Sequence, residues 1–280
     1  MGLGTAWIEK HSLGAQGAEY TLTFLERGLL AGRVLWFYIG KLLLPVDLTF
    51  IYPHWTIRAS DMLLYCFPLS FLGLLGALWA FRARIGRGPL VAFLVFAITL
   101  FPALGFINVF PFRFSYVADH FQYLASAGLI ALAASGIVHL DRVNPGFRPA
   151  LTWALALLFG LLTWNQARSY TNLETLWRDT LEKNPDAQMV HFNLGNLLAR
   201  RGNSTQAIEQ YTECLRIMPD DYQSYANRAL LLARRGNKEE ARADYLKGLE
   251  IAQKTRNGEA QLILLEGLKA LSGEGKALGQ

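Results

Sequence analysis

The segment RFSYVADHFQYLAS, residues 113–126, places four side chains that can do chemistry beside long apolar stretches: Arg113, Asp119, His120 and Tyr123. A guanidinium can bind a phosphate or a carboxylate, and a carboxylate can orient an imidazole or a neighbouring arginine. Polar and aromatic side chains of these types also anchor proteins at the boundary between water and lipid. The segment therefore predicts either an anion-binding site or a ring of interfacial anchors, and the sequence leaves both interpretations open.

The surrounding composition is typical of a membrane protein. Hydrophobic residues make up 52% of the 280 residues and charged residues 18%, whereas soluble domains carry about 25% charged residues. A helix needs roughly 20 apolar residues to cross the hydrocarbon core of a bilayer. We predict membrane-spanning helices over the four uncharged stretches 62–81, 89–110, 121–139 and 149–167.

An earlier apolar segment, Leu25–Leu44, is ambiguous because it carries Glu26, Arg27, Arg33 and Lys41. A charged side chain at the centre of a spanning helix costs about 2.5–3.5 kcal/mol on insertion scales. Either the segment spans, with the Lys41 side chain reaching the interface, or it is an interfacial or re-entrant segment. We assign a membrane domain to residues 25–168 in both cases, after an amino-terminal extension over 1–24 without a recognisable signal peptide.

Basic residues indicate the orientation of this domain. The loop RARIGRG at 82–88 contains three arginines, and HLDRVNPGFR at 139–148 contains two arginines and one acid. Since Lys and Arg accumulate in short loops on the cytoplasmic side, we expect both loops inside. Residues 45–61, residues 105–120 and everything after residue 168 are then expected outside, where Asp119 would share a surface with Asp47, His54 and Arg58.

The carboxyl-terminal part of the chain repeats itself. MVHFNLGNLLARRGNSTQAIEQY matches QSYANRALLLARRGNKEEARADY at an offset of 34 residues, which is the period of the tetratricopeptide repeat. Equivalent positions include Leu198 and Leu232, Gly202 and Gly236, Ala207 and Ala241, and Tyr211 and Tyr245. Small residues let the two helices of a hairpin approach closely, and glycine supplies the turn between them.

This repeat fixes the expected fold class. A single hairpin leaves one apolar face exposed, so neighbouring units must stack. We predict a repeat domain over 169–271, with flanking helices at 172–185 and 259–271, and a frayed tail over 272–280. The whole chain is expected to be all-α: a transmembrane helix bundle followed by a tetratricopeptide solenoid.

Repeats of this kind usually bind extended peptides in a groove lined by the first helix of each unit. Asn193 and Asn227 occupy equivalent positions there, and Arg200 and Arg234 follow two turns later. An Asn side chain can both donate to and accept from one peptide group, and an arginine attracts carboxylates. These four residues are our predicted peptide groove; the alternative is that the arginines are solvated residues that favour the ends of their helices.

The sequence shows no motif for nucleic-acid binding, nucleotide binding, serine hydrolysis or a metal site. Basic and acidic residues are nearly equal in number after Arg168, so no basic stripe for nucleic acid is present. The sequence contains no phosphate-binding Walker loop, no G-x-S-x-G, no C-x-x-C and no H-E-x-x-H. We therefore predict no cofactor, no metal site and no nucleic-acid partner.

The stretch ERGLLAGRVLWFYIGKLLLPVDLTFIYPHW, the stretch RFSYVADHFQYLASAGL and the repeats together resemble a known family. They are similar to bacterial relatives of the transmembrane and tetratricopeptide-containing O-mannosyltransferases, which are membrane glycosyltransferases of the GT-C type. The resemblance implies a polyprenyl-phosphate-linked sugar as donor, a protein or peptide as acceptor, and the inner membrane with the repeats on the periplasmic side. It also implies a lipid-phosphate pocket, with Arg113 on the phosphate and Asp119 orienting His120 or a nearby arginine.

Two departures from the family pattern leave the activity open. Such enzymes carry their catalytic acid in a first exterior loop near the amino terminus, so we expect this chain to correspond to the carboxyl-terminal half of a longer member. His120 also stands where relatives tend to have arginine. Our leading hypothesis is a membrane protein that presents its repeats to a protein partner, and the alternative is a fragment or subunit of a glycosyltransferase. An assembly factor with a membrane anchor is a third reading.

Overall fold

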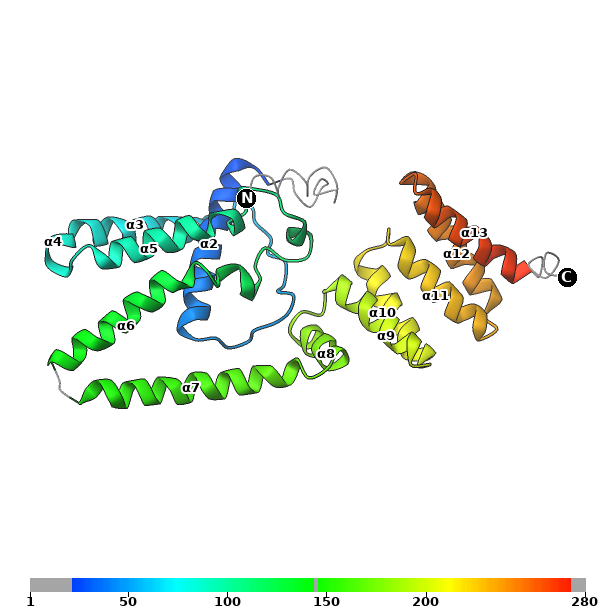
Figure 1. The fold of residues 1–280 in the computed structure, drawn as a ribbon. Helices are drawn as coiled ribbons and strands as arrows, with labels where there is room; N and C mark the ends of the chain where they lie inside the picture. Colours follow the sequence, from blue (N-terminus) through cyan, green and yellow to red (C-terminus); the bar gives the residue numbers. More distant parts are fainter. Residues whose placement is uncertain (1–21, 144–145, 273–280) are drawn as a thin grey trace. The chain divides into compact units, whose positions relative to one another are not determined.

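The computed structural model describes residues 22–143 and 146–272, and these ranges contain helices and no strand. The chain divides into two units, residues 1–171 and residues 172–280, which we call the apolar unit and the repeat unit (Figure 1). The predicted boundary at residue 169 lies close to this division. The predicted extension over 1–24 and tail over 272–280 lie almost entirely outside the described residues.

The apolar unit contains six α-helices and four short 3-10 turns in its described part. The α-helices are α2 (Phe24–Leu43), α3 (Cys66–Ala80), α4 (Arg82–Ile85), α5 (Gly88–Leu100), α6 (Ser126–Val143) and α7 (Phe147–Ser169). The 3-10 turns are η2 (Met62–Tyr65), η3 (Phe101–Ala103), η4 (Phe110–Arg113) and η5 (Asp119–Gln122). Helix α2 packs on α3, α5 packs on α3 and α6, and α6 contacts α7.

Helix α2 is the centre of the core of this unit. Its side chains Leu29, Leu30, Val34 and Tyr38 are fully or almost fully buried. They pack with residues of α3, α5 and the following loops, including Phe71, Phe96, Leu100, Phe112 and Val117. The ambiguous segment of the sequence is thus a buried helix of the unit, with a Thr23–Glu26 capping box at its start.

Two of the expected spanning helices have different bounds in the structure. The helix expected over 89–110 ends at Leu100 and continues only as the turn η3, because Pro102 has no amide hydrogen for the helical bond and Gly105 takes a φ of 93°. The helix expected over 121–139 begins at Ser126, since the preceding residues form the separate turn η5.

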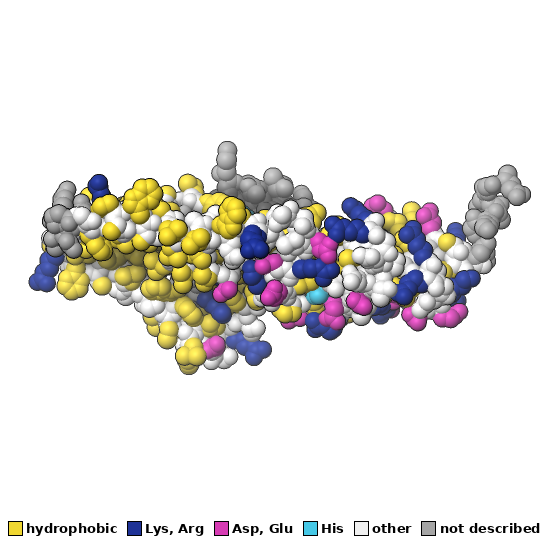
Figure 2. Space-filling model, turned by 90° about the horizontal axis from the view of Figure 1, so that it is seen from below, with side chains coloured by type: hydrophobic (Ala, Val, Ile, Leu, Met, Phe, Trp, Pro, Cys, Tyr) yellow, Lys and Arg dark blue, Asp and Glu magenta, His cyan; other side chains and the backbone are white. Residues whose placement is uncertain are grey.

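Within residues 22–143 and 146–272, two helical segments are long and apolar enough to cross a membrane: Met62–Ala80, made of η2 and α3, and α7. Little of either segment is buried within the protein. Figure 2 shows hydrophobic side chains gathered over the apolar unit and charged side chains over the repeat unit. Helix α5 with η3 and helix α6 are apolar as well, but shorter.

The repeat unit consists of α8 (Leu173–Lys183), α9 (Gln188–Arg200), α10 (Ser204–Ile217), α11 (Tyr222–Arg234), α12 (Lys238–Lys254) and α13 (Gly258–Ser272). The hairpins α9–α10 and α11–α12 have equivalent turns, because Gly202 and Gly236 take positive φ values of 82° and 89°. Ala207 and Ala241, where the helices cross, are both fully buried. The predicted tetratricopeptide solenoid is confirmed.

The close approach of α2 and α3 generates a stability prediction. A Cβ atom at Gly32 would lie 2.4 Å from the backbone nitrogen of Pro68, whereas one at Gly28, one turn earlier, would meet nothing within 4 Å. Replacing Gly32 by Ala should therefore destabilise the unit by about 1–3 kcal/mol through overpacking. Gly28→Ala should leave stability unchanged or raise it by up to about 1 kcal/mol through helix propensity.

The thermal midpoints of the two variants in detergent solution measure this difference. Equal midpoints for Gly32→Ala and Gly28→Ala would contradict the contact between α2 and α3.

Candidate functional site

The loop after α2 (residues 44–61) and the loop before α6 (residues 104–125) lie against each other in the apolar unit. The Tyr52 hydroxyl donates to Asp119 Oδ1 at 2.7 Å. His54 Nε2 lies 3.0 Å from the carbonyl oxygen of Phe112, and the ring centroids of His54 and Tyr116 are 4.1 Å apart. The structure thus brings together the two segments that the sequence places on one surface.

Helix α2 fixes the backbone beside Asp119. The Tyr38 hydroxyl donates to the carbonyl oxygen of Ala118 at 3.0 Å and accepts from the amide of the same residue, also at 3.0 Å. Tyr38 is completely buried. Because both bonds go to the residue that precedes Asp119, the position of this carboxylate is set by the core of the unit.

The four residues predicted from RFSYVADHFQYLAS have different surroundings. Arg113, at the end of η4, and Asp119, at the start of η5, are partly buried, whereas His120 and Tyr123 are exposed. The His120 ring packs edge-on against Phe121 with 4.7 Å between centroids. The contact between Asp119 and Tyr52 was not foreseen, because the sequence gives no sign of which side chain of the 44–61 loop meets this carboxylate.

Burial and charge keep Tyr52 protonated. The side chain is almost fully buried, and burial raises the pKa of its hydroxyl well above the ordinary value. The hydrogen bond to the Asp119 carboxylate raises the pKa further. Tyr52 therefore remains a hydrogen-bond donor to Asp119 throughout the physiological pH range.

The charged residues of α2 have partners in the same two loops. Arg27 donates to the carbonyl oxygen of Gly105 at 2.6 Å and to Asn108 Oδ1 at 2.8 Å. Glu26 accepts from the amide of Ala59 at 3.3 Å. The Arg33 guanidinium lies 4.3 Å from the centroid of the Trp55 ring, a cation–π contact.

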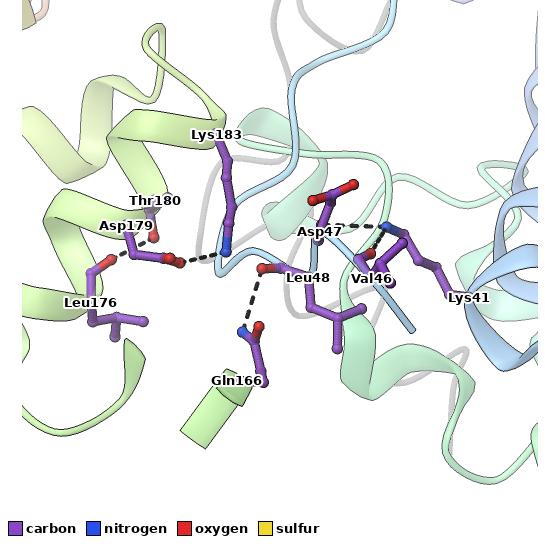
Figure 3. Close-up of polar contacts among 9 residues, drawn as sticks. All are labelled: Lys41, Val46, Asp47, Leu48, Gln166, Leu176, Asp179, Thr180 and Lys183. Carbon is purple, nitrogen blue, oxygen red and sulfur yellow. Dashed lines mark hydrogen bonds and ion pairs between the residues drawn. The ribbon is translucent and has the colours of Figure 1, made fainter. Parts of the chain in front are cut away.

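The far end of α2 is held in the same way (Figure 3). Lys41 Nζ donates to the carbonyl oxygens of Val46 and Asp47, at 2.6 and 3.3 Å. Gln166 of α7 donates to the carbonyl oxygen of Leu48 at 3.3 Å. Asp47 takes a φ of 50°, which is unusual for a residue other than glycine. The first residues of the 44–61 loop are thus tied to both α2 and α7.

The repeat unit has a pocket of about 310 Å³. It lies between α9 and α11, which are the first helices of the two hairpins, and the last helix, α13. Apolar side chains provide much of its lining, with amide and carboxylate groups among them. The lining residues are Phe192, Tyr222, Gln223, Ala226, Asn227, Asn257, Glu259, Ala260, Ile263 and Leu264. The pocket can therefore receive an apolar side chain with polar groups around it.

Of the four predicted groove residues, Asn227 lines this pocket and Asn193, Arg200 and Arg234 do not. Arg200 and Arg234 are exposed at the ends of α9 and α11. Glu259 is the charged group that lines the pocket, so the pocket favours a ligand with a cationic group. The predicted groove arginines had instead suggested a ligand with a carboxylate.

An amide network behind the pocket was missed by the sequence analysis. Asn227 Nδ2 donates to Asn196 Oδ1 at 3.0 Å, and the Tyr211 hydroxyl donates to the same oxygen at 2.7 Å. Burial raises the pKa of Tyr211 to about 12, so its hydroxyl remains a donor. Asn196 lies one turn after Asn193 in α9, and its equivalent in the next repeat is Leu230, so the offset gave no signal.

Asn257 positions the last helix beside this pocket. Its Oδ1 accepts from the amide of Ala260 at 3.1 Å, which caps α13, and its Nδ2 donates to the Tyr222 hydroxyl at 3.2 Å. One Asn thus joins α13 to α11. Asn257 could have been found from the sequence, because an Asn just before a predicted helix is a typical capping residue.

Comparisons with known proteins agree with the repeats seen in the structure. Two tetratricopeptide repeat models match residues 189–221 and residues 223–257. The chain is also similar to the protein O-mannosyl-transferase TMTC4 of Mus musculus, with 32% identity over 133 residues, which is 45% of the chain. The match covers 16% of the mouse protein, so the chain spans a small part of that relative's length. The chain therefore contains tetratricopeptide repeats and resembles an O-mannosyltransferase that carries such repeats.

Proposed function

We propose that this chain is an integral protein of a bacterial inner membrane whose repeat unit binds a protein or peptide on the periplasmic side. Three features support the membrane part of the proposal: two helical segments long and apolar enough to cross a membrane, a large exposed apolar surface, and arginines in the loop that joins α3 to α5. Lys and Arg in short loops mark the cytoplasmic side. The repeat unit carries the binding function.

The pocket between α9, α11 and α13 is the observation that carries the proposal. Its apolar lining can desolvate one aliphatic or aromatic side chain of an extended segment. The Asn227 amide can exchange hydrogen bonds with a peptide group beside that side chain, and Glu259 can pair with a cationic residue next to it. We propose an extended peptide with an apolar anchor and a basic neighbour as the ligand.

Substitutions in the pocket test this binding. Ile263 and Glu259 line the pocket and are exposed, so Ile263→Ser and Glu259→Gln should fold normally. Losing the apolar contact should weaken a bound peptide about tenfold, which corresponds to about 1.4 kcal/mol. Peptides can be selected on the full chain from a random displayed library, and their affinities measured by fluorescence anisotropy.

Helix α13 provides matched controls for both changes. Leu262 and Glu266 are exposed on the same helix but do not line the pocket. Leu262→Ser and Glu266→Gln should leave the affinity within about twofold of that of the native chain, because surface substitutions usually have small effects. If the controls weaken binding as much as the pocket variants, the peptide does not use this pocket.

Cysteine labelling tests the orientation. In a chain with Cys66→Ser and Cys214→Ala, a single cysteine replaces either Gln206 of α10 or Ala83 of α4, both exposed. An impermeant thiol reagent applied to spheroplasts should label the cysteine at 206 and react with the one at 83 only after the membrane is opened. Labelling in the reverse pattern would place the repeats in the cytoplasm.

A second candidate function is part of a polyprenyl-phosphate-sugar-dependent protein O-glycosyltransferase. The similarity to a protein named O-mannosyl-transferase favours it. Arg113 and Asp119, which are each partly buried, supply residues for a lipid phosphate and its orientation. In this reading Tyr52 holds the Asp119 carboxylate in place. His120 and Tyr123, which are exposed, would lie at the rim of the site.

Activity measurements separate the two functions. Membranes that contain the full native product, a polyprenyl-phosphate-linked sugar and an acceptor peptide should transfer the sugar if the chain belongs to such an enzyme. Arg113→Ala and Asp119→Ala should then lower the rate by about 100-fold or more, the size expected when a positioned charged group is lost. Arg235→Ala, an exposed change in the repeat unit, is the control. Unchanged rates in both variants would exclude this site from catalysis.

A further inference from the structure

A cleft of about 920 Å³ lies between α5 and α6, away from the loops that hold Asp119. Arg84, Arg87 and His139 line its polar end, and Val95, Leu132 and Gly136 are among the residues that line the rest. None of these residues belongs to the candidate sites described above. The cleft combines cationic groups with an apolar channel.

The shape of the cleft follows from the packing of the two helices. Helices α5 and α6 approach closely at Gly128, where a Cβ atom would lie 3.2 Å from the carbonyl oxygen of Ala92. From there they diverge toward α4 and the end of α6 (Figure 1). The diverging part of α6 carries the small residues Ser135 and Gly136, and a Cβ atom at Gly136 would meet nothing within 4 Å. The space between the helices therefore remains open.

The cationic end of the cleft is available to an anion. Arg84 and Arg87 are exposed, and none of the acidic side chains described by the structure pairs with them. The adjacent start of α5 has no side-chain cap, so the positive end of its dipole adds to the attraction. Arg82 of the same loop is already engaged by other groups. It donates to the carbonyl oxygen of Trp79, and its guanidinium lies 4.2 Å from the centroid of the Trp79 ring.

We infer that this cleft binds an anionic phospholipid, with its phosphate between Arg84 and Arg87 and an acyl chain along the apolar walls. Arginine suits phosphate because its planar guanidinium donates two parallel hydrogen bonds. Basic pockets between membrane helices on the cytoplasmic side bind anionic headgroups for this reason. The apolar channel beyond the arginines selects a lipid over a free phosphate. The inference rests on the membrane insertion proposed above, and not on peptide binding by the repeats.

Native mass spectrometry of the full chain in detergent tests the site. The probes are phosphatidylglycerol and phosphatidylcholine with identical acyl chains. Two arginines near the headgroup should favour phosphatidylglycerol by about thirtyfold in dissociation constant. The double variant Arg84→Gln, Arg87→Gln should reduce this preference to about twofold or less, whereas Arg82→Gln, which removes one positive charge from the same loop but not from the cleft lining, should retain it.

A second variant tests the channel with the charges intact. Gly136→Leu fills the cleft and should weaken the binding of both lipids, while its thermal midpoint stays close to that of the native chain because the added side chain enters open space. Equal binding of the two lipids by the native chain would overturn the inference. So would an Arg82→Gln variant that loses the preference, or displacement of the lipid by glycerol phosphate at equal concentration.

Peptide affinity measured on the same preparations keeps the two proposals apart. The cleft variants should bind selected peptides as the native chain does, because the cleft lies in the apolar unit and the peptide pocket in the repeat unit. Loss of lipid preference with retained peptide binding would therefore concern the lipid site alone.

Discussion

The hydrogen bonds between helix α2 and the two loops that surround it are the constraint on which the apolar unit depends. Arg27 donates to Gly105 and Asn108, Lys41 donates to the start of the 44–61 loop, and Tyr38 both donates to and accepts from Ala118. The loops have few regular hydrogen bonds of their own, so they need these partners. Because the outer surface of the unit is largely apolar, its polar groups find their partners inside, around one buried helix.

This arrangement links the core to the candidate site at Asp119. Tyr38 holds the backbone at Ala118, and Tyr52 of the other loop donates to the adjacent carboxylate. The carboxylate is therefore positioned by residues from two separate segments before any ligand arrives. Such preorganisation is needed by a binding or catalytic site, but it also suits a loop that only has to remain folded at a membrane surface.

The repeats were predictable from sequence, and the interior of the apolar unit was not. An offset of 34 residues aligns Gly202 with Gly236 and thereby predicts two equivalent turns, because the information is local and repeated. The four charges of α2 left its role ambiguous in the sequence, because their partners are not local: those of Arg27, Gly105 and Asn108, lie about 80 residues away in the chain. Asn196 was missed because its role depends on Asn227 in the next repeat.

The two polar regions of the apolar unit lie at opposite ends of α5. The Arg84 and Arg87 end of the cleft adjoins the start of this helix, while the loop that carries Asp119 follows its end. A helix of 13 residues, as α5 is, is about 20 Å long at a rise of 1.5 Å per residue. One phosphate cannot contact both regions. If α5 is inserted in a bilayer, a lipid held by the arginines and a lipid-linked donor at Arg113 would approach from opposite leaflets, so the first can stabilise the α5–α6 pair without competing for the second.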